Sequence, residues 1–287
     1  MHDQANHLRA LVSAGRRLGP VSNSAPRLIA LAGGKGGVGV TTLAIRLAQA
    51  LARDGRRTLL VDADTQRPDV ATVCQLQDGY SVADVLYGRR TMHEAIRLGP
   101  GGIQILPGVS PLGQTAPRAG ATPWTPAAQE RFIADLRSLG PHADVALLDV
   151  GSACDAVAHR FWQAADEVLL VTTPDPVAVL DAYAAVKTFW AGAGKTPVAS
   201  LVNQSNDEAE AAEVHERLRQ ACRRFLGADL AQAGTAPADN ALARVCATAV
   251  AALNHLTQCE LNRIAERYGP PAGGVATGKL VLEQAHA

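Results

Sequence analysis

Hydrophobic residues along the chain form short apolar runs that alternate with longer segments of helical periodicity. Short runs that are apolar at every position are typical of parallel strands covered on both faces. The predicted strands span residues 27–32, 57–64, 102–108, 143–151, 167–175 and 197–204. The segments between them predict helices over 43–54, 127–139, 176–191, 206–226 and 239–268. This alternation predicts an α/β fold, a three-layer sandwich with helices on both faces of a mostly parallel central sheet.

Stretches rich in Gly and Pro, the first of them at residues 19–26, indicate how the chain is divided. Residues 3–18 precede this first stretch and place several apolar side chains near one helical face. We expect an N-terminal helix over 1–18, a linker over 19–26, one domain over 27–268 and a tail over 269–287. Two interpretations of the N-terminal helix stay open: it docks on its own domain, or it is presented to a partner.

Composition narrows the class of protein. The 287 residues carry 27 Lys and Arg against 27 Asp and Glu, and 47% are hydrophobic, which is the balance of a compact globule and not of a disordered chain. No run approaches the roughly 18 apolar residues that a membrane span needs. The five cysteines are odd in number and form no C-x-x-C pair, which favours a reducing compartment, so we expect a cytoplasmic protein. Zero net charge makes DNA an unlikely partner.

A glycine-rich turn follows the first predicted strand, where open parallel sheets bind ligands. It fits two templates. Residues 34–39 match the dinucleotide fingerprint G-x-G-x-x-G, with Asp62 or Asp64 roughly where a ribose-binding acid would follow. Residues 34–41 match a phosphate-binding P-loop in which Val40 replaces the lysine. Both templates use glycine because backbone N–H groups must approach phosphate oxygens closely.

Three features favour a nucleoside triphosphate over a dinucleotide. Thr41 and Thr42 begin the helix, where a hydroxyl can ligate Mg²⁺. Lys35 lies inside the loop, where a cation suits a triphosphate. Asp149 ends a buried apolar strand, the position of a magnesium-supporting acid in P-loop enzymes. The eight histidines are scattered, so no other metal chemistry is indicated.

These residues resemble the ParA/MinD group of ATPases with a deviant Walker A motif. The resemblance lies in KGGVG-x-TT at 35–42, VDAD at 61–64, the strand that carries Asp149, and the segment 171–187. Within this group the sequence is similar to the FlhG/FleN type, regulators of flagellar number and placement. That similarity lies in residues 80–96, 99–108 and 164–176, and in an N-terminal D-Q-A-x-x-L-R motif formed by Asp3, Gln4, Ala5, Leu8 and Arg9.

The resemblance implies a role for each site residue. Lys35 would be the signature lysine that reaches phosphates across an ATP-sandwiched dimer, and Asp64 would position or polarise the attacking water. Thr41 would ligate Mg²⁺, with Asp62 and Asp149 supporting the metal. The nucleotide would contact Gly34, Gly36, Gly37, Val38, Gly39, Val40, Thr41, Thr42 and Asn203, the last of these through adenine.

Val40 is the main departure from the group, because most members have the P-loop lysine there. Its absence removes a charge-assisted contact worth roughly 1.5–3 kcal/mol. We therefore expect ATP and Mg²⁺ to bind and hydrolysis to be slow or absent, so turnover as an ATPase stays open. Arg67 and Pro68 also differ from the usual sequence after the second strand.

The resemblance implies an ATP-dependent dimerising switch that regulates flagellar number or placement. Its implied partners are a second copy of the chain, an FlhF-like GTPase of the signal-recognition type, bound through the D-Q-A-x-x-L-R motif, and a flagellar switch-complex protein. It also implies transient association with the inner face of the membrane or a cell pole, although the tail GKLVLEQAHA gives no support for anchoring. The alternatives are a non-hydrolysing scaffold, a DNA-partitioning ATPase of the ParA type and, more distantly, an NAD-dependent oxidoreductase.

Overall fold

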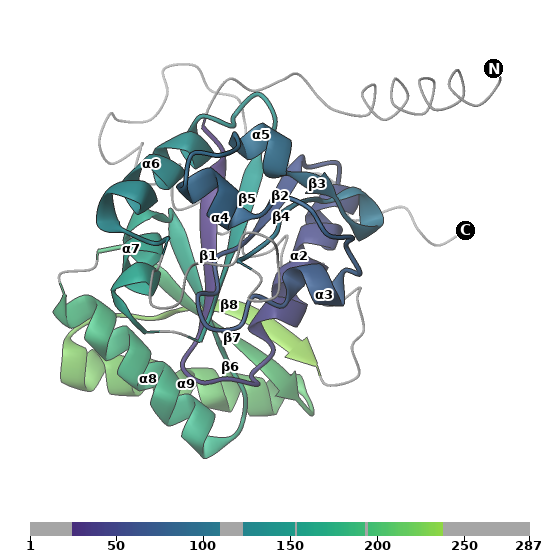
Figure 1. Cartoon of the computed structure of the whole chain (residues 1–287). Coiled ribbons are helices and arrows are strands. Elements are labelled where there is room, and N and C mark those ends of the chain that lie inside the picture. The colour runs from purple at the N-terminus through teal and green to yellow at the C-terminus, as the bar shows by residue number, and fades with distance from the viewer. Residues whose placement is uncertain (1–24, 110–122, 153, 193–194, 238–287) are drawn as a thin grey trace, which may run out of the picture.

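A central sheet of eight strands organises the molecule in the computed structural model (Figure 1). The structure describes residues 25–109, 123–152, 154–192 and 195–237. The strand order is β3-β4-β2-β5-β1-β6-β7-β8, and every neighbouring pair is parallel except β3 with β4. Helices cover both faces of this sheet, as the alternating pattern predicts. Among the described residues, no helix combines the length and apolar character needed to cross a membrane.

The strands and helices follow the sequence pattern closely in their central parts. The strands are β1 (Arg27–Gly33), β2 (Thr58–Asp62), β3 (Arg97–Leu98), β4 (Gln104–Leu106), β5 (Val145–Gly151), β6 (Glu167–Thr172), β7 (Val198–Ser205) and β8 (Ala231–Pro237). The longer helices are α2 (Val40–Arg53), α6 (Pro126–Arg137), α7 (Ala156–Ala164), α8 (Pro176–Ala191) and α9 (Glu208–Leu226). Three short helices, α3 (Val70–Val73), α4 (Val82–Leu86) and α5 (Met92–Ala95), lie between β2 and β3.

Alternate residues of each central strand supply two separate hydrophobic cores. In β1, Leu28 and Ala30 face a core that includes side chains of α6, α7 and α8, whereas Ile29 and Leu31 face a core built with α2. Figure 1 shows α6, α7 and α8 on one side of the sheet and α2 on the other. Burial on both faces explains why these strands are apolar at every position.

The structure corrects the sequence predictions at several edges. Residues 231–237 form the edge strand β8, which was not predicted because AQAGTAP is poor in β-branched and aromatic residues; pairing with β7 holds it in the sheet. The strand predicted over 102–108 is shorter, at 104–106, and an unpredicted antiparallel strand at 97–98 pairs with it. The predicted helices over 1–18 and 239–268, the linker over 19–26, apart from Ala25 and Pro26, and the tail over 269–287 lie outside the described residues.

Candidate functional site

A cavity of about 330 Å³ opens where β1, β2 and β5 end, at the start of α2. Sequence analysis placed ligand binding at this edge of the sheet. The predicted site residues that line the cavity are Lys35, Gly36, Gly37, Gly39, Val40, Thr41, Thr42 and Asp64. The remaining predicted residues lie in the loop or in neighbouring strands: Gly34, Val38, Asp62, Asp149 and Asn203.

The glycine-rich loop is held in place by Asn203 on β7. The Asn203 Nδ2 atom donates a hydrogen bond of 2.8 Å to the carbonyl oxygen of Val38. Gly39, the residue before α2, has φ 92°, and a Cβ atom there would lie 2.4 Å from Nδ2 of Asn203. Glycine is therefore required at position 39 both by the left-handed backbone and by the close approach of Asn203. The loop presents the N-terminus of α2 to the cavity, an arrangement suited to phosphate.

Two buried acids lie side by side beneath the loop. Asp62 on β2 and Asp149 on β5 are register partners in adjacent strands. Asp149 is fully buried, and its Oδ1 accepts a hydrogen bond from the Gly151 N–H. Its Oδ2 has no hydrogen-bond partner within normal hydrogen-bond geometry among the described residues. Burial raises the pKa of Asp149 to about 6, although the neighbouring Thr41 hydroxyl acts in the opposite direction. Burial, and then the charge of Asp149, raise the pKa of Asp62 well above its ordinary value.

These acids fit a magnesium ion that shares its ligands with a bound phosphate. An ionised carboxylate that is buried without a partner is costly, and a cation beside it offsets that cost. Among the residues that the structure places, no group of three or more His, Cys, Asp or Glu side chains could hold a metal by itself. Mg²⁺ typically takes one or two carboxylates together with phosphate oxygens and water. The donor set therefore suits Mg²⁺ bound with a nucleotide.

Asp64 stands in the cavity wall with one oxygen fixed. Its Oδ1 accepts hydrogen bonds from the backbone N–H groups of Gln66 (2.7 Å) and Arg67 (2.9 Å). Its Oδ2 faces Gly151, where an added Cβ would lie only 1.9 Å away. Gly151 has φ 67°, so this position too is suited to glycine. The geometry fixes the Asp64 carboxylate rigidly at the cavity edge.

Lys35 contacts its own chain. Its Nζ atom forms an ion pair of 2.8 Å with Oδ2 of Asp175, the residue that caps α8 by accepting a hydrogen bond from the Val177 N–H. This hydrogen bond raises the pKa of Lys35 and lowers that of Asp175. The lysine is thus charged and held beside α8 in this conformation of the single chain.

Val40 belongs to the hydrophobic core as much as to the cavity. Its side chain is 6% exposed and packs with residues of β1 and α2. A Cβ atom added at Gly33 would lie 3.0 Å from its Cγ2 atom, so the valine fills the space directly under the loop. The position that carries a charged lysine in most P-loops therefore carries apolar packing here.

Sequence analysis did not assign five of the residues that line the cavity to the site: Arg67, Asp69, Gly151, Ser152 and Gln204. Arg67 lies three residues after Asp64. The sequence signal that could have assigned it to the site was its difference from the residue usual in the ParA/MinD group at this position. Gln204 lies in β7 with φ 59°, next to an irregularity in the pairing with β8. A glutamine in the left-handed region is uncommon and concentrates at functional sites. The sequence carries no signal for this backbone conformation.

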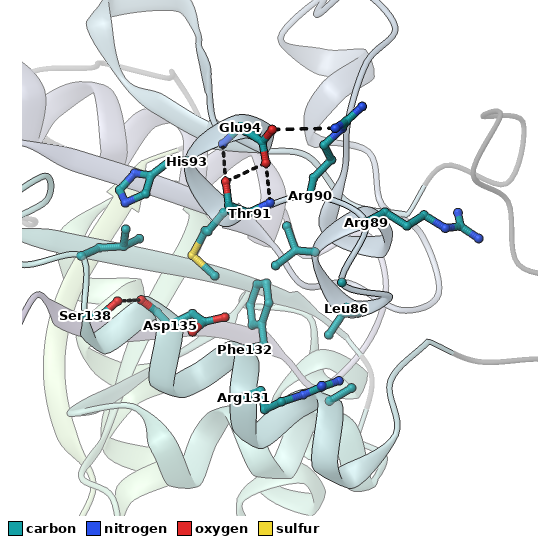
Figure 2. A pocket seen from close by; sticks show the side chains of 15 residues that line it. Leu86, Arg89, Arg90, Thr91, His93, Glu94, Arg131, Phe132, Asp135 and Ser138 are labelled. Carbon is teal, nitrogen blue, oxygen red and sulfur yellow. Dashed lines mark hydrogen bonds and ion pairs between the residues drawn. The ribbon is translucent and has the colours of Figure 1, made fainter.

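A second cavity of about 450 Å³ lies between α4, α5 and α6, away from the loop (Figure 2). Figure 2 shows Glu94 at its rim, bonded to Thr91 and facing Arg90. Glu94 and Thr91 form the capping box of α5, and the Arg90 guanidinium lies 4.4 Å from the centre of the Tyr80 ring. These polar groups already have structural partners, so the glycine-loop cavity is the better candidate site.

Comparisons with known proteins identify a family and two relatives of this chain. Residues 26–190 match the family model described as an AAA domain. The chain is 33% identical over 216 residues to the antiactivator FleN of Pseudomonas aeruginosa, covering 75% of each chain. It is 29% identical over 188 residues to the flagellum site-determining protein YlxH of Helicobacter pylori, covering 65% of this chain and 62% of that protein.

The fold also matches solved structures. The septum site-determining protein MinD of Pyrococcus horikoshii, complexed with Mg-ADP, superposes with a TM-score of 0.58 at 23% identity, covering 80% of this chain and 88% of that one. This likeness supports the fold alone. The family model, the FleN relative and this fold together show that the chain belongs to the ParA/MinD group of P-loop ATPases and is of the FlhG/FleN type.

Proposed function

We propose that the protein is an ATP-dependent dimerising switch that regulates the number or placement of flagella, with weak hydrolysis. ATP and Mg²⁺ binding is supported above all by the buried pair Asp62 and Asp149 beneath a glycine-rich helix start. The flagellar role is supported by similarity to YlxH, which is named a flagellum site-determining protein, and by the FlhG/FleN-type resemblance that the antiactivator FleN shares.

The proposed roles of the site residues come from the family resemblance, and the geometry of the cavity supports them. The loop from Gly34 to Thr42 cradles the phosphates through its N–H groups, and Thr41 supplies a hydroxyl to Mg²⁺, which Asp62 and Asp149 support. For Asn203, which holds the loop through Val38, we propose a contact with the adenine, as the family resemblance implies. Mg²⁺ neutralises phosphate charge when bound, and Asp64 orients a water molecule at the cavity edge.

Weak hydrolysis is proposed from Val40. Phosphoryl transfer depends on positioning and on neutralising charge that develops in the transition state, and a buried valine offers no charge. A lysine at this position would act partly on bound ATP and partly on the transition state, so its loss lowers turnover more than binding. A non-hydrolysing scaffold is the alternative that the packing of Val40 favours.

Dimerisation requires Lys35 to leave Asp175. In the proposed ATP-bound dimer Lys35 reaches the phosphates of the second copy, so the ion pair of the single chain breaks. An exposed ion pair of this kind is weak and can exchange partners readily. We also propose that residues 3–9 bind an FlhF-like GTPase, and that a flagellar switch-complex protein is a further partner.

The test is the absolute mass of the full chain in solution with Mg-ATP, with Mg-ADP and without nucleotide, while phosphate release is followed in the same samples. A dimer with ATP alone and slow release of phosphate is the expected result. An unchanged mass and no retained nucleotide would exclude the switch. A peptide of residues 1–20 that left the GTPase rate of the FlhF-like partner unchanged would exclude the proposed contact, and normal flagellar number after gene deletion would exclude the flagellar role.

A further inference from the structure

The proposed nucleotide cavity is short of positive charge for a triphosphate. Among the described residues that line it, Lys35 and Arg67 are the two with a positive side chain. In the single chain Lys35 is paired with Asp175 and serves phosphates only in the proposed dimer, and Val40 occupies the lysine position of the P-loop with an apolar side chain. A triphosphate brings several negative charges, and Mg²⁺ balances two of them. The backbone N–H groups of the loop supply only partial charges.

Arg67 is placed to make up this deficit. Its backbone N–H donates to Oδ1 of Asp64 at 2.9 Å, so the main chain of residue 67 is tied to the wall of the cavity. Pro68 follows it, and a proline restricts the backbone of the residue before it. The guanidinium is nevertheless only weakly held. It is 79% exposed, and Asp69, at 3.7 Å, is its partner in a solvent-exposed ion pair.

Such an ion pair contributes little and is readily exchanged for a better partner. A guanidinium binds phosphate in a bidentate manner, with two charge-assisted hydrogen bonds in a fixed geometry. Replacing the Asp69 carboxylate by a phosphate group with more charge is therefore favourable for Arg67. An anchored backbone and a long, exposed side chain in a weak ion pair at the cavity wall are the properties that a phosphate-binding residue needs.

We propose that Arg67 supplies the phosphate-binding cation that the P-loop lacks at Val40, by pairing with a phosphate group of the bound nucleoside triphosphate. The inference rests on the proposed function, because it assumes that a triphosphate binds in this cavity. It adds a residue from the segment after β2 to a phosphate site otherwise built from the loop and α2.

The test is equilibrium binding of Mg-ATP to the full chain and its variants. Arg67→Ala is expected to weaken binding by about 10- to 100-fold, the range for a charge-assisted hydrogen bond. The affinity of Arg67→Lys for Mg-ATP should lie between those of the wild type and Arg67→Ala, because an ammonium keeps the charge and loses the bidentate geometry. Arg53→Ala removes an exposed arginine from the far end of α2 and should leave binding unchanged. Thermal unfolding of each variant checks that the fold is intact.

A second background separates a phosphate contact from a general loss of positive charge. If Arg67 replaces the missing lysine, Arg67→Ala should cost clearly less in a Val40→Lys chain than in the wild type, because the new ammonium takes over the contact. Equal binding of Mg-ATP by the wild type and Arg67→Ala would overturn the role of Arg67 and leave the proposed function standing. A wild-type chain that binds no Mg-ATP would overturn both.

Discussion

Glu167 at the start of β6 carries a stability cost that depends on pH. Its side chain is 3% exposed, and its Oε2 atom has no hydrogen-bond partner in the described part of the chain. Burial raises its pKa from 4.5 to about 8, even though the charge of Arg27 acts in the opposite direction. The folded state therefore holds this proton more tightly than the unfolded state does. Stability falls as pH rises from about 4.5 to about 8 and is level outside that window.

The Glu167→Gln variant removes this titration while keeping a similar volume. Each pH unit inside the window costs the wild type about 1.4 kcal/mol, so at pH 7 the accumulated cost is about 3 kcal/mol. Because the side chain is almost fully buried, screening by solvent reduces this figure little. The amide of the variant and the protonated acid of the wild type are both neutral and both lack the same hydrogen-bond partner. The two proteins should therefore be similarly stable at pH 4.

Urea unfolding of both proteins at pH 4, 7 and 9 measures the effect. At pH 4 the two proteins should have similar free energies of unfolding. At pH 7 the free energy of unfolding of Glu167→Gln should be higher than that of the wild type by about 3 kcal/mol, and at pH 9 the difference should be larger still. Glu130→Gln, at an exposed position on α6, is the matched control and should change little at any pH. A difference between Glu167→Gln and wild type that does not vary with pH would refute the reasoning.

Three further predictions concern the nucleotide site. Val40→Lys should bind Mg-ATP about 10- to 100-fold more tightly than Val40→Met in equilibrium titrations, because only the lysine adds a charge-assisted contact; equal affinities would mean that the ammonium does not reach the phosphates. Asp149→Asn should abolish most of the Mg²⁺ dependence of nucleotide binding, measured by titrating Mg²⁺ at fixed ATP, and an unchanged dependence would remove this residue from the metal site. Gly39→Ala should destabilise the protein more than Gly55→Ala in urea unfolding: both have positive φ, at a cost of about 1–2 kcal/mol, but only at Gly39 does an added Cβ meet another side chain, at 2.4 Å. Equal losses would show that the loop shifts freely.

The sequence predicted those parts of the fold whose local pattern and tertiary environment agree. Strands such as β5 are buried on both faces and therefore read as unbroken apolar runs, and α8 has the same bounds, 176–191, in the prediction and in the structure. The edge strand β8 was missed because its residues have little strand propensity and depend on a neighbour for pairing. The short helices α3, α4 and α5 were not predicted, because a segment of four or five residues carries too little helical periodicity to detect.

The sequence grouped residues that belong to one local motif, and it missed contacts that depend on tertiary placement. The glycine loop and its threonines line one cavity, as spacing alone implied. The partner of Lys35 was not foreseen, because Asp175 is 140 residues away in the sequence. Gln204 was missed because its left-handed backbone arises from irregular pairing between β7 and β8, and no residue type in the sequence marks it.

The central place of β1 in the sheet has a consequence for how the two halves of the molecule open. Its loop is clamped from one flank by Asn203 of β7, and the acids of β2 and β5 lie on the other flank. A ligand held between these flanks bridges strands that would otherwise separate independently. Amide hydrogen exchange in β2, β5 and β7 should therefore slow together when Mg-ATP binds, because opening either flank then requires the ligand to leave.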